Sequence, residues 1–416
     1  MYQGIKTVSF EEAVKVVKSG DRIHIHSVAC APQGLIQALC NRGRAGELRD
    51  VKLQHLHTEG SAPYAEAEFE GIFFLESYFV GSNVRKPTQE GYADYVPVHL
   101  SETQKLIRSG IHPVDVAMIQ VCPPDKHGFV SMGTSVDATL AAVQNAKTVI
   151  AVINPNVPRA WGDAIIKLSD IDIFCEDNTP LIEAHPATLT EQDIAIGKNV
   201  ASLIEDGATL QMGIGAIPNA VLSQLGNHKN LGIHTEMFAD GVLPLYEKGV
   251  VNNMNKKFDK GKIVSTFLMG SKRVYDFIDD NPGVAMMDVG YTNDPFIIAQ
   301  QPKMTAINSA LSVDITGQVN ADSLGIKFYS GSGGQLDFIR GAAASEGGKP
   351  IIALPAVTNK GVSKICPTLL NGAGVVTTRF DVHYIVTEFG IADLYGKTLQ
   401  ERAKTLINIA HPDHRE

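Results

Sequence analysis

The residues Thr209-Leu-Gln-Met-Gly-Ile-Gly-Ala-Ile-Pro-Asn-Ala-Val-Leu-Ser-Gln-Leu225 decide how the rest of the chain is interpreted. They predict a strand over 209–212, a glycine loop at Gly213-Ile-Gly215, and a helix with Pro218 in its first turn, where proline needs no backbone donor. Such a loop offers unpaired N–H groups, and a helix N-terminus adds a partial positive charge of about half a unit. This stretch therefore predicts a place where an oxyanion or a phosphate could bind.

The next short segment, Gly232-Ile-His-Thr-Glu236, is apolar at alternate positions and ends in a carboxylate. If it forms the neighbouring parallel strand, Glu236 emerges beside the glycine loop at the carboxyl edge, where open α/β sheets bind their ligands. Two plainer interpretations compete with this one. A glycine loop before a helix is common in α/β proteins, and a single glutamate at a strand end is often only a solvated loop residue.

The first half of the chain repeats this order of features. A turn, a strand, a helix begun by proline, and a strand ending in His-Thr-Glu occur at 19–59 and again at 205–236. We infer a divergent duplication. Because the first copy has Ser-Val-Ala-Cys at 27–30 in place of the glycine loop, the second half is the better candidate for chemistry.

Length, composition and charge limit the class of protein. The 416 residues suffice for two or three ordinary domains, and 44% hydrophobic with 19% charged residues is typical of a globular protein. A net charge of −9 argues against nucleic acid or an anionic membrane as a partner. No apolar run approaches the roughly 18 residues of a membrane span, no leader-like segment opens the sequence, and five cysteines form no CxxC pair. We therefore expect a cytoplasmic protein with reduced thiols.

The remaining segments alternate between predicted strands and helices. Largely apolar runs at 116–121 and 148–153 indicate a mostly parallel sheet that is covered by helices, and 263–268 predicts a further strand in the second half. The predicted fold is therefore α/β, with two similar domains, 1–186 and 187–416. The second domain carries the candidate site.

Other catalytic patterns fit poorly. The chain has no Gly-x-Ser-x-Gly motif, and the loop at 213–218 lacks the third glycine of a dinucleotide-binding fingerprint. His24 with His26, and His55 with His57, lack a third ligand at a telling spacing, so we expect no metal site. A carboxylate that attacks a carbonyl, with backbone N–H groups to stabilise the oxyanion, fits the remaining features.

Five motifs carry a resemblance to a known family. They are Gly-Ile-Gly-Ala-Ile-Pro at 213–218, Gly-Ile-His-Thr-Glu at 232–236, Gly-Ser-Gly-Gly-Gln-Leu-Asp-Phe at 331–338, Thr-Glu-Phe-Gly-Ile-Ala-Asp-Leu-Tyr-Gly at 387–396, and Arg402-Ala with Ile-Ala-His-Pro-Asp at 409–413. Along its whole length the chain resembles the acetyl-CoA hydrolase/transferase family. Within the family it is most similar to the 4-hydroxybutyrate and butyryl-CoA:acetate CoA-transferases.

The resemblance implies a tandem of CoA-transferase-like domains with the active site and CoA pocket between them. It also implies a ping-pong exchange of CoA between a short acyl-CoA, most often C4, and a carboxylate such as acetate. Glu236 matches the nucleophile, which would form a mixed anhydride and then a glutamyl-CoA thioester. Coenzyme A is then a substrate, no cofactor is tightly bound, and the expected assembly is a homo-oligomer, a dimer or a tetramer.

The resemblance also assigns roles to other residues. Gly334 matches a glycine whose N–H helps to form the oxyanion hole, and Glu388 matches a second active-site glutamate, although a carboxylate that merely orders its loop is the alternative. We expect no covalent role for Glu59. The residues that match CoA contacts are Gly213, Ile214, Gly215, Ala216, Ile217, Gly333, Gly334 and Lys360.

Two other activities remain open on this scaffold. A net acyl-CoA hydrolase would need water to reach the glutamyl thioester. A non-catalytic acyl-CoA-binding protein would bind its ligand without turnover, and the presence of the nucleophile argues against it.

Overall fold

The computed structural model describes residues 4–185 and 188–416, and the chain forms two compact units. Unit 1 comprises Met1–Ala184 with Thr266–Tyr291, and unit 2 comprises His185–Ser265 with Thr292–Glu416. The boundary expected between 186 and 187 falls on residues outside the described ranges. The segment 266–291, which that boundary assigns to the second half, groups with unit 1 instead.

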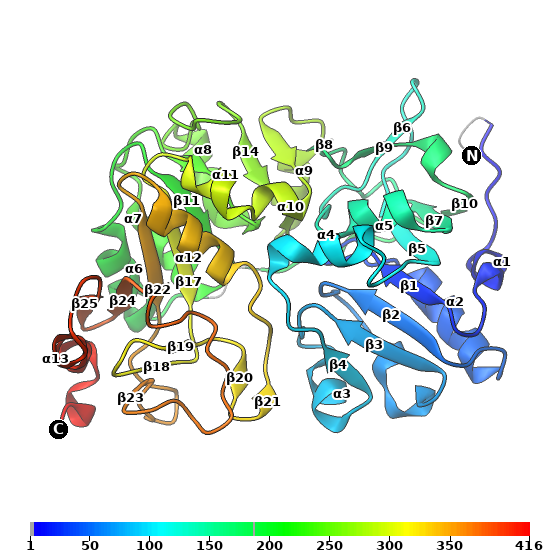
Figure 1. The fold of residues 1–416 in the computed structure, drawn as a ribbon. Coiled ribbons are helices and arrows are strands. Elements are labelled where there is room, and N and C mark those ends of the chain that lie inside the picture. Colours follow the sequence, from blue (N-terminus) through cyan, green and yellow to red (C-terminus); the bar gives the residue numbers. More distant parts are fainter. Residues whose placement is uncertain (1–3, 186–187) are drawn as a thin grey trace. The chain divides into compact units, whose positions relative to one another are not determined.

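Unit 1 is built on a seven-stranded sheet in the order β10-β7-β5-β1-β2-β3-β4, and every neighbouring pair in it is parallel (Figure 1). All six residues of β5 (Val116–Val121) are buried, as a strand covered on both faces requires. The other strands of the sheet are β1 (Arg22–Ile25), β2 (Val51–His55), β3 (Phe73–Ser77), β4 (Ala93–Tyr95), β7 (Thr148–Ile153) and β10 (Ile173–Glu176). Its helices are α1 (Phe10–Ala13), α2 (Gln33–Arg44), α3 (Arg85–Glu90), α4 (Leu100–Arg108), α5 (Thr139–Asn145) and α9 (Lys272–Ile278), and its short strands are β6 (Phe129–Ser131), β8 (Trp161–Gly162), β9 (Ile165–Lys167), β15 (Phe267–Leu268) and β16 (Val284–Met286).

Unit 2 is built on a six-stranded sheet in the order β12-β11-β17-β22-β24-β25 (Figure 1). The first five strands are parallel, and β25 returns antiparallel to β24. These strands are β11 (Thr209–Met212), β12 (Gly232–Ile233), β17 (Thr305–Ser309), β22 (Lys349–Ala353), β24 (Tyr384–Thr387) and β25 (Gly390–Asp393). The helices are α6 (Glu191–Ala201), α7 (Ala216–Gln224), α8 (Leu243–Glu247), α11 (Pro295–Ala299), α12 (Gln335–Ala344) and α13 (Leu399–Ile409), with α10 (Val289–Thr292) at the passage from unit 1, and the short strands are β13 (Met237–Phe238), β14 (Ile263–Ser265), β18 (Ser312–Asp314), β19 (Val319–Asn320), β20 (Ser323–Leu324), β21 (Lys327–Phe328) and β23 (Ile365–Cys366).

The two sheets share a strand order. In unit 1 the neighbours run β2-β1-β5-β7-β10, and in unit 2 they run β12-β11-β17-β22-β24, each in the same sequence order along the chain. Helix α2 follows β1 as α7 follows β11. The predicted α/β fold, with two similar units and mostly parallel sheets, is confirmed, and the common order agrees with a duplication.

One predicted strand is wrong in detail. The segment 263–268 forms two short strands, β14 and β15, because the chain leaves unit 2 and enters unit 1 between Ser265 and Thr266. Its apolar residues predict burial, but they do not show which of two cores receives each part.

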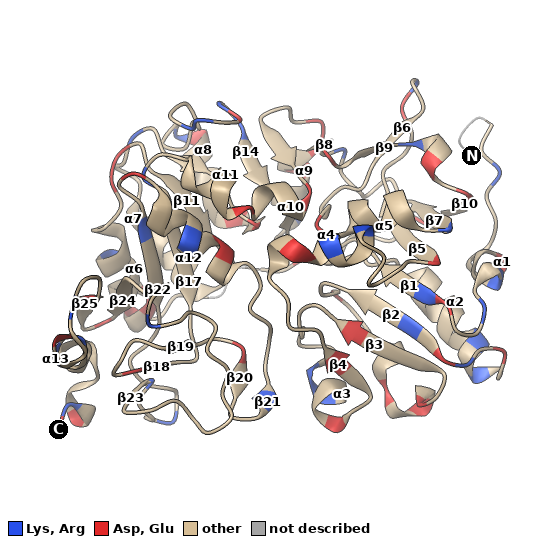
Figure 2. Cartoon of the chain, viewed as in Figure 1, with Lys and Arg blue, Asp and Glu red and all other residues tan. Residues whose placement is uncertain are grey.

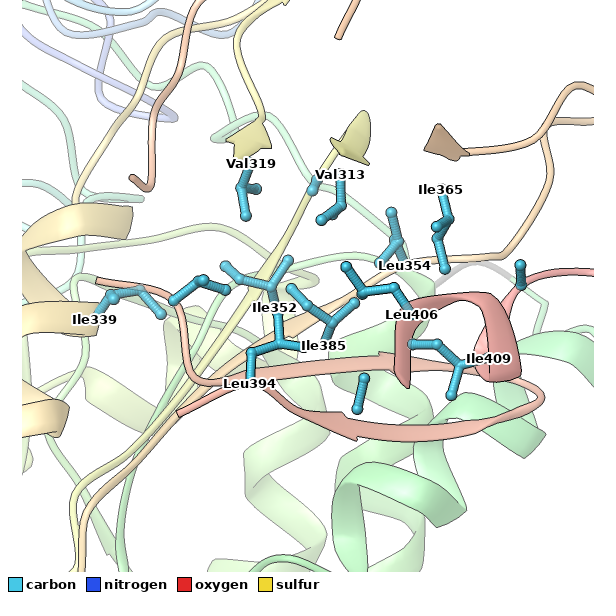
Figure 3. Close-up of a cluster of buried hydrophobic side chains, with 14 residues drawn as sticks. Val313, Val319, Ile339, Ile352, Leu354, Ile365, Ile385, Leu394, Leu406 and Ile409 are labelled. Carbon is cyan, nitrogen blue, oxygen red and sulfur yellow. The ribbon is translucent and has the colours of Figure 1, made fainter. Parts of the chain in front are cut away.

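A hydrophobic cluster holds the far strands of the unit 2 sheet to the C-terminal helix (Figure 3). Ile352 of β22 and Ile385 of β24 lie in this cluster with Leu406 and Ile409 of α13. Helix α13 begins after Thr398, which caps it and forms a capping box with Glu401. Each fully buried aliphatic side chain contributes roughly 1.5–3 kcal/mol, so this cluster fixes the sheet against which the site is built.

A second cluster positions α12. Phe338 and Ala342 of this helix are buried against Ile298 of α11 and Ala306 of β17. The helix pair is close-packed, because a Cβ on Gly341 would collide with Ile298. The N-terminus of α12 is therefore held rigidly on the sheet that carries the candidate site.

Charges are dispersed over both units. Figure 2 shows Lys and Arg interspersed with Asp and Glu along the ribbons of each. In the described ranges, 4–185 and 188–416, we find no helix that is both long and apolar enough to cross a bilayer. The five cysteines are free thiols, and all but Cys366 are buried.

Candidate active site

Glu236 lies three residues beyond the last residue of β12, at the carboxyl end of that strand. The predicted strand 232–236 is shorter than expected, because the ladder ends in an isolated bridge between His234 and Val264. Thr235 then fixes the turn, since its single hydroxyl proton is shared between the carbonyl oxygens of Met212, 3.0 Å from Oγ1, and Met237, 2.9 Å from it. Because Met212 is the last residue of β11, this contact holds Glu236 beside the glycine loop.

The carboxyl group of Glu236 is held by two donors. Asn293 Nδ2 donates to Oε2 at 2.9 Å, and the backbone N–H of Gly334 also hydrogen-bonds to the carboxylate. A Cβ at position 334 would collide with Glu236 Oε2 and with Asn293 Nδ2. The structure therefore brings together Glu236 and Gly334, and a side chain at position 334 would displace Glu236 or Asn293.

The surroundings of Glu236 set its protonation. Burial, with a smaller contribution from the nearby charge of Asp337, raises the pKa of its carboxyl to about 7 against the opposing hydrogen bonds from Asn293 and Gly334. A carboxylate with a pKa near neutrality is more basic than an ordinary one but is still ionised in part at pH 7. That combination suits a nucleophile.

A cavity of about 310 Å³ opens beside Glu236. The glycine loop, Gly213 to Ile217, forms one wall, and side chains at the carboxyl ends of β11 and β17 form another. A Cβ on Gly213 or Gly215 would meet open space, and Gly215 has φ 120°, which L side chains rarely adopt. The remaining lining residues are Asp193, Gln211, Pro218, Ile307, Asn308 and Ser309.

The loop and the helix after it suit an anion. Gly215 is the N-cap residue of α7, so the loop leads directly into the N-terminus of this helix. The first N–H groups of a helix have no partner within the helix, so they can bind a phosphate or an oxyanion that approaches this backbone. The predicted strand, loop and helix over 209–225 are confirmed by the structure.

Gly333 prepares the turn into α12. Its φ of 52° lies in the left-handed region, and the following residue, Gly334, is the N-cap of the helix. The conformation of Gly333 therefore directs the N–H of Gly334. The structure gives it this backbone role, and its contact with CoA stays a prediction.

Glu388 lies elsewhere in unit 2, in the turn between β24 and β25. Its carboxylate accepts hydrogen bonds from the N–H of Ala356 at 2.9 Å and from Gln192 Nε2 at 2.5 Å, and Lys364 is near enough to interact with its charge. Within the described part of the chain, none of its hydrogen bonds reaches Glu236. These contacts order the loop that starts at Ala356.

Lys360 lies on that same loop and is exposed. Its backbone N–H donates to Thr358 Oγ1 at 3.3 Å. The structure places the lysine in unit 2 with Glu236 but outside the lining of the cavity. Its predicted contact with CoA is untested.

The first-half counterpart, Glu59, is built differently. Its backbone N–H donates to the carbonyl of Val28 at 3.1 Å, and Val28 occupies the region where the second half has its glycine loop. Burial raises the pKa of the Glu59 carboxyl. Its expected lack of a covalent role stays a prediction.

The histidine pairs of unit 1 have local partners. His24 Nε2 lies 3.0 Å from Thr139 Oγ1, and His26 Nε2 lies 2.8 Å from the carbonyl of Ser135. Among residues 4–185 and 188–416, no three His, Cys, Asp or Glu side chains are grouped so as to hold a metal ion.

Asn293 is the functional candidate that sequence reasoning missed. It is 57 residues from Glu236 in the chain and belongs to no recognisable motif. The turn residues Asn-Asp-Pro at 293–295 predict only a loop before a helix. Nothing local in the sequence shows that this loop reaches the carboxylate.

Comparisons with known proteins match both halves of the chain to one family. The sequence profile of the acetyl-CoA hydrolase/transferase N-terminal domain matches residues 2–183, and that of the C-terminal domain matches residues 270–416. The chain belongs to the acetyl-CoA hydrolase/transferase family. The predicted family is therefore confirmed.

The similar members of the family are CoA-transferases. A succinyl-CoA:acetate/propanoyl-CoA:succinate CoA transferase from Fasciola hepatica is 52% identical over 98% of this chain and 85% of its own. A 4-hydroxybutyrate coenzyme A transferase from Clostridium kluyveri is 47% identical over 99% of this chain and 96% of its own. The crystal structure of 4-hydroxybutyrate CoA-transferase from Porphyromonas gingivalis superimposes with a TM-score of 0.85 at 37% identity, covering 99% of this chain and 95% of that one. An acetyl-CoA hydrolase from Yarrowia lipolytica is more distant, at 28% identity over 81% of this chain and 72% of its own.

Proposed function

We propose that this protein is a CoA-transferase, which moves CoA between a short-chain acyl-CoA and a carboxylate through a glutamyl-CoA thioester at Glu236. One observation carries the proposal. A carboxyl group with a pKa of about 7 lies between two hydrogen-bond donors, Asn293 Nδ2 and the N–H of Gly334, at the wall of a cavity formed by a glycine loop. The names of the similar relatives support the same reaction class.

The first half-reaction makes a thioester on the protein. The ionised carboxylate of Glu236 attacks the carbonyl carbon of the acyl thioester, the C–S bond breaks, and CoA leaves as a thiolate with an acyl-glutamyl anhydride behind it. The thiolate then attacks the glutamyl carbonyl of the anhydride and expels the acyl group as a free carboxylate. An incoming acid reverses both steps, and no ATP is consumed because one thioester replaces another.

The two donors act on the charge as it moves. When the thiolate attacks the glutamyl carbonyl of the anhydride, negative charge develops on the glutamyl oxygen, and the fixed N–H groups of Asn293 and Gly334 stabilise it there without reorganising. Asn293 and Gly334 are supplied by rigid elements, since Gly334 caps a helix that is packed into the core. Loss of one such donor typically costs roughly 10²–10³ in rate.

The loop at 213–217 is proposed to bind the CoA moiety. Its glycines allow close approach to the backbone, and the cavity that it lines reaches Glu236. Lys360 is proposed to pair with a phosphate of CoA, as its motif implies. Coenzyme A is then a substrate and not a tightly bound cofactor.

A four-carbon acyl group is the proposed substrate. Succinyl and 4-hydroxybutyryl, which appear in the names of the relatives at 52% and 47% identity, both contain four carbons. Butyryl belongs to the same size class. Acetate is the proposed acceptor acid.

Assembly and location complete the proposal. We infer a cytoplasmic homo-oligomer, a dimer or a tetramer, from the resemblance that the sequence carries. Light scattering on the purified protein measures the mass of the assembly directly.

An acceptor panel tests the function. Butyryl-CoA, succinyl-CoA and 4-hydroxybutyryl-CoA are supplied separately, each with and without acetate, and both acetyl-CoA and free thiol are measured. A transferase forms acetyl-CoA only when acetate is present and releases almost no free thiol. Thiol release that is independent of acetate would instead indicate a hydrolase, and saturable binding without turnover would indicate a binding protein.

A further inference from the structure

His234 directly follows β12, and its side chain contacts the segment that contains Asn293. Its Nε2 lies 2.8 Å from the carbonyl oxygen of Thr292, the residue directly before Asn293. A carbonyl oxygen can only accept, so Nε2 carries the proton and donates. Asn293 in turn donates to Glu236 Oε2 at 2.9 Å.

His234 is itself held firmly. Its backbone N–H donates to the carbonyl of Leu210 on β11, and on its other side it bridges to Val264. Its imidazole is fully buried, and its ring centroid lies 6.3 Å from that of Phe338 in α12. The histidine therefore contacts both elements that direct a donor at Glu236, the segment before Asn293 and the helix that Gly334 caps.

The ring stays neutral over the working pH range. Burial, with a smaller contribution from the positive charge of Lys256, lowers the pKa of His234 to about 3, while the hydrogen bond to Thr292 and the charge of Asp259 oppose the shift. A neutral ring with its proton on Nε2 makes the same hydrogen bond throughout. His234 is thus suited to fixing a position and not to transferring protons.

We propose that His234 is a positioning residue for the nucleophile: it holds the Thr292 carbonyl and thereby keeps the Asn293 amide on Glu236 Oε2. The inference rests on the proposed function, because it assigns the task of the first residue in the His-Thr-Glu motif during thioester formation. It also explains why a histidine precedes the nucleophile by two positions. His234 hydrogen-bonds to Thr292, and Glu236 accepts from Asn293, so both side chains contact consecutive residues of one neighbouring segment.

The first test compares His234→Met with His234→Gln. Methionine keeps the bulk and loses the donor, whereas the terminal amide of glutamine can still donate to Thr292. His234→Met should lower kcat about 10- to 100-fold with little change in KM for the acyl-CoA, since misplacing a reacting group by about 1 Å can cost 10²-fold. His234→Gln should retain most of the activity.

A second readout follows from the direction of the Asn293 contact. Its hydrogen bond favours the ionised carboxylate, so loosening it raises the pKa of Glu236 and moves the acidic limb of the kcat/KM profile to higher pH. Asn293→Ala should move the limb in the same direction. The double variant His234→Met/Asn293→Ala should be no slower than Asn293→Ala alone, because both changes remove one interaction.

His228→Met is the matched control. His228 Nε2 also lies near a backbone carbonyl, that of Ile204 at 3.1 Å, but the residue precedes β12, at the amino edge of the sheet. Its substitution should leave kcat and the pH profile unchanged. The control separates the general effect of losing a histidine–carbonyl hydrogen bond from the effect of losing the bond between His234 and Thr292.

Three results would overturn the proposal. These are a His234→Met enzyme with wild-type kcat and pH limb, effects of His234→Met and Asn293→Ala that simply add, and a His234→Gln enzyme as impaired as His234→Met. If His234→Met does not fold, His234→Asn replaces it, because its shorter amide cannot reach Thr292, and wild-type behaviour of that variant overturns the proposal. A ¹³C NMR titration of the Glu236 carboxyl tests the positioning without turnover, so its result stands even if the wild-type protein exchanges no CoA and the proposed function fails.

Discussion

The surroundings of Glu236 raise the pKa of its carboxyl group. Its carboxyl is surrounded by protein, lies near Asp337 and receives two hydrogen bonds, and the balance leaves its pKa at about 7. Sequence reasoning found the residue because it ends a strand beside a glycine loop. It did not find Asn293, whose contact depends on how the chain folds back from 57 residues away.

Gly334 tests the role of the second donor. A Cβ at this position would collide with Glu236 Oε2 and Asn293 Nδ2, so Gly334→Ala should displace the carboxylate and lower kcat roughly 10²–10³-fold. The binding of CoA should weaken much less. Gly226→Ala is the control, because a Cβ there meets open space, and steady-state kinetics on both variants decide the matter. Equal turnover in the two variants would remove Gly334 from the site.

At the scale of elements, local patterns were reliable and pairings were not. The strand β11, the glycine loop and α7 were predictable because the period of the apolar residues and the position of Pro218 all agree. The order of strands in the sheet could not be predicted, because it depends on contacts between segments far apart in the chain. The run 263–268 shows the limit, since it divides between two cores at Ser265.

The loop that begins at Ala356 is the element on which the role of Glu388 depends. Glu388→Ala removes the acceptor for the Ala356 N–H and for Gln192, so the loop that carries Lys360 should loosen. A hydrogen bond to a charged group is worth about 1.5–3 kcal/mol, so KM for CoA esters should rise about tenfold or more with kcat nearly unchanged.

Lys360→Ala should give the same pattern, and the two changes together should be less than additive. Lys404→Ala, on the exposed side of α13, is the control. A collapse of kcat with an unchanged KM in Glu388→Ala would place this glutamate in the chemical steps instead.

At the scale of the whole molecule, the duplication explains why one half carries the chemistry. Both sheets have the same strand order, but only unit 2 has the open glycine loop beside its His-Thr-Glu segment. The repeat could be seen in the sequence because a short motif recurs. The sequence did not show that residues 266–291 belong to unit 1, because no change in composition marks either end of this segment.

The raised pKa of Glu236 also affects global stability. A carboxyl whose pKa is about 7 when folded and about 4.5 when unfolded holds its proton more tightly in the folded state, so it destabilises the fold progressively as the pH rises from about 4.5 to 7. Glu236→Gln should therefore match the wild type at pH 4 and exceed its free energy of unfolding by about 1–3 kcal/mol at pH 8. Urea unfolding at both pH values measures this. A difference that is the same at pH 4 and pH 8 would contradict the assigned pKa.

The covalent intermediate tests the central claim most directly. The protein is incubated with butyryl-CoA in the absence of acceptor acid, reduced with borohydride and analysed by peptide mass spectrometry, because a ping-pong enzyme completes its first half-reaction alone. The account predicts that Glu236 alone is converted to the alcohol, that activity is lost in proportion, and that free CoA leaves the protein unmodified. Modification of Glu59, Glu388 or any other carboxylate, or no modification in an active preparation, would contradict it.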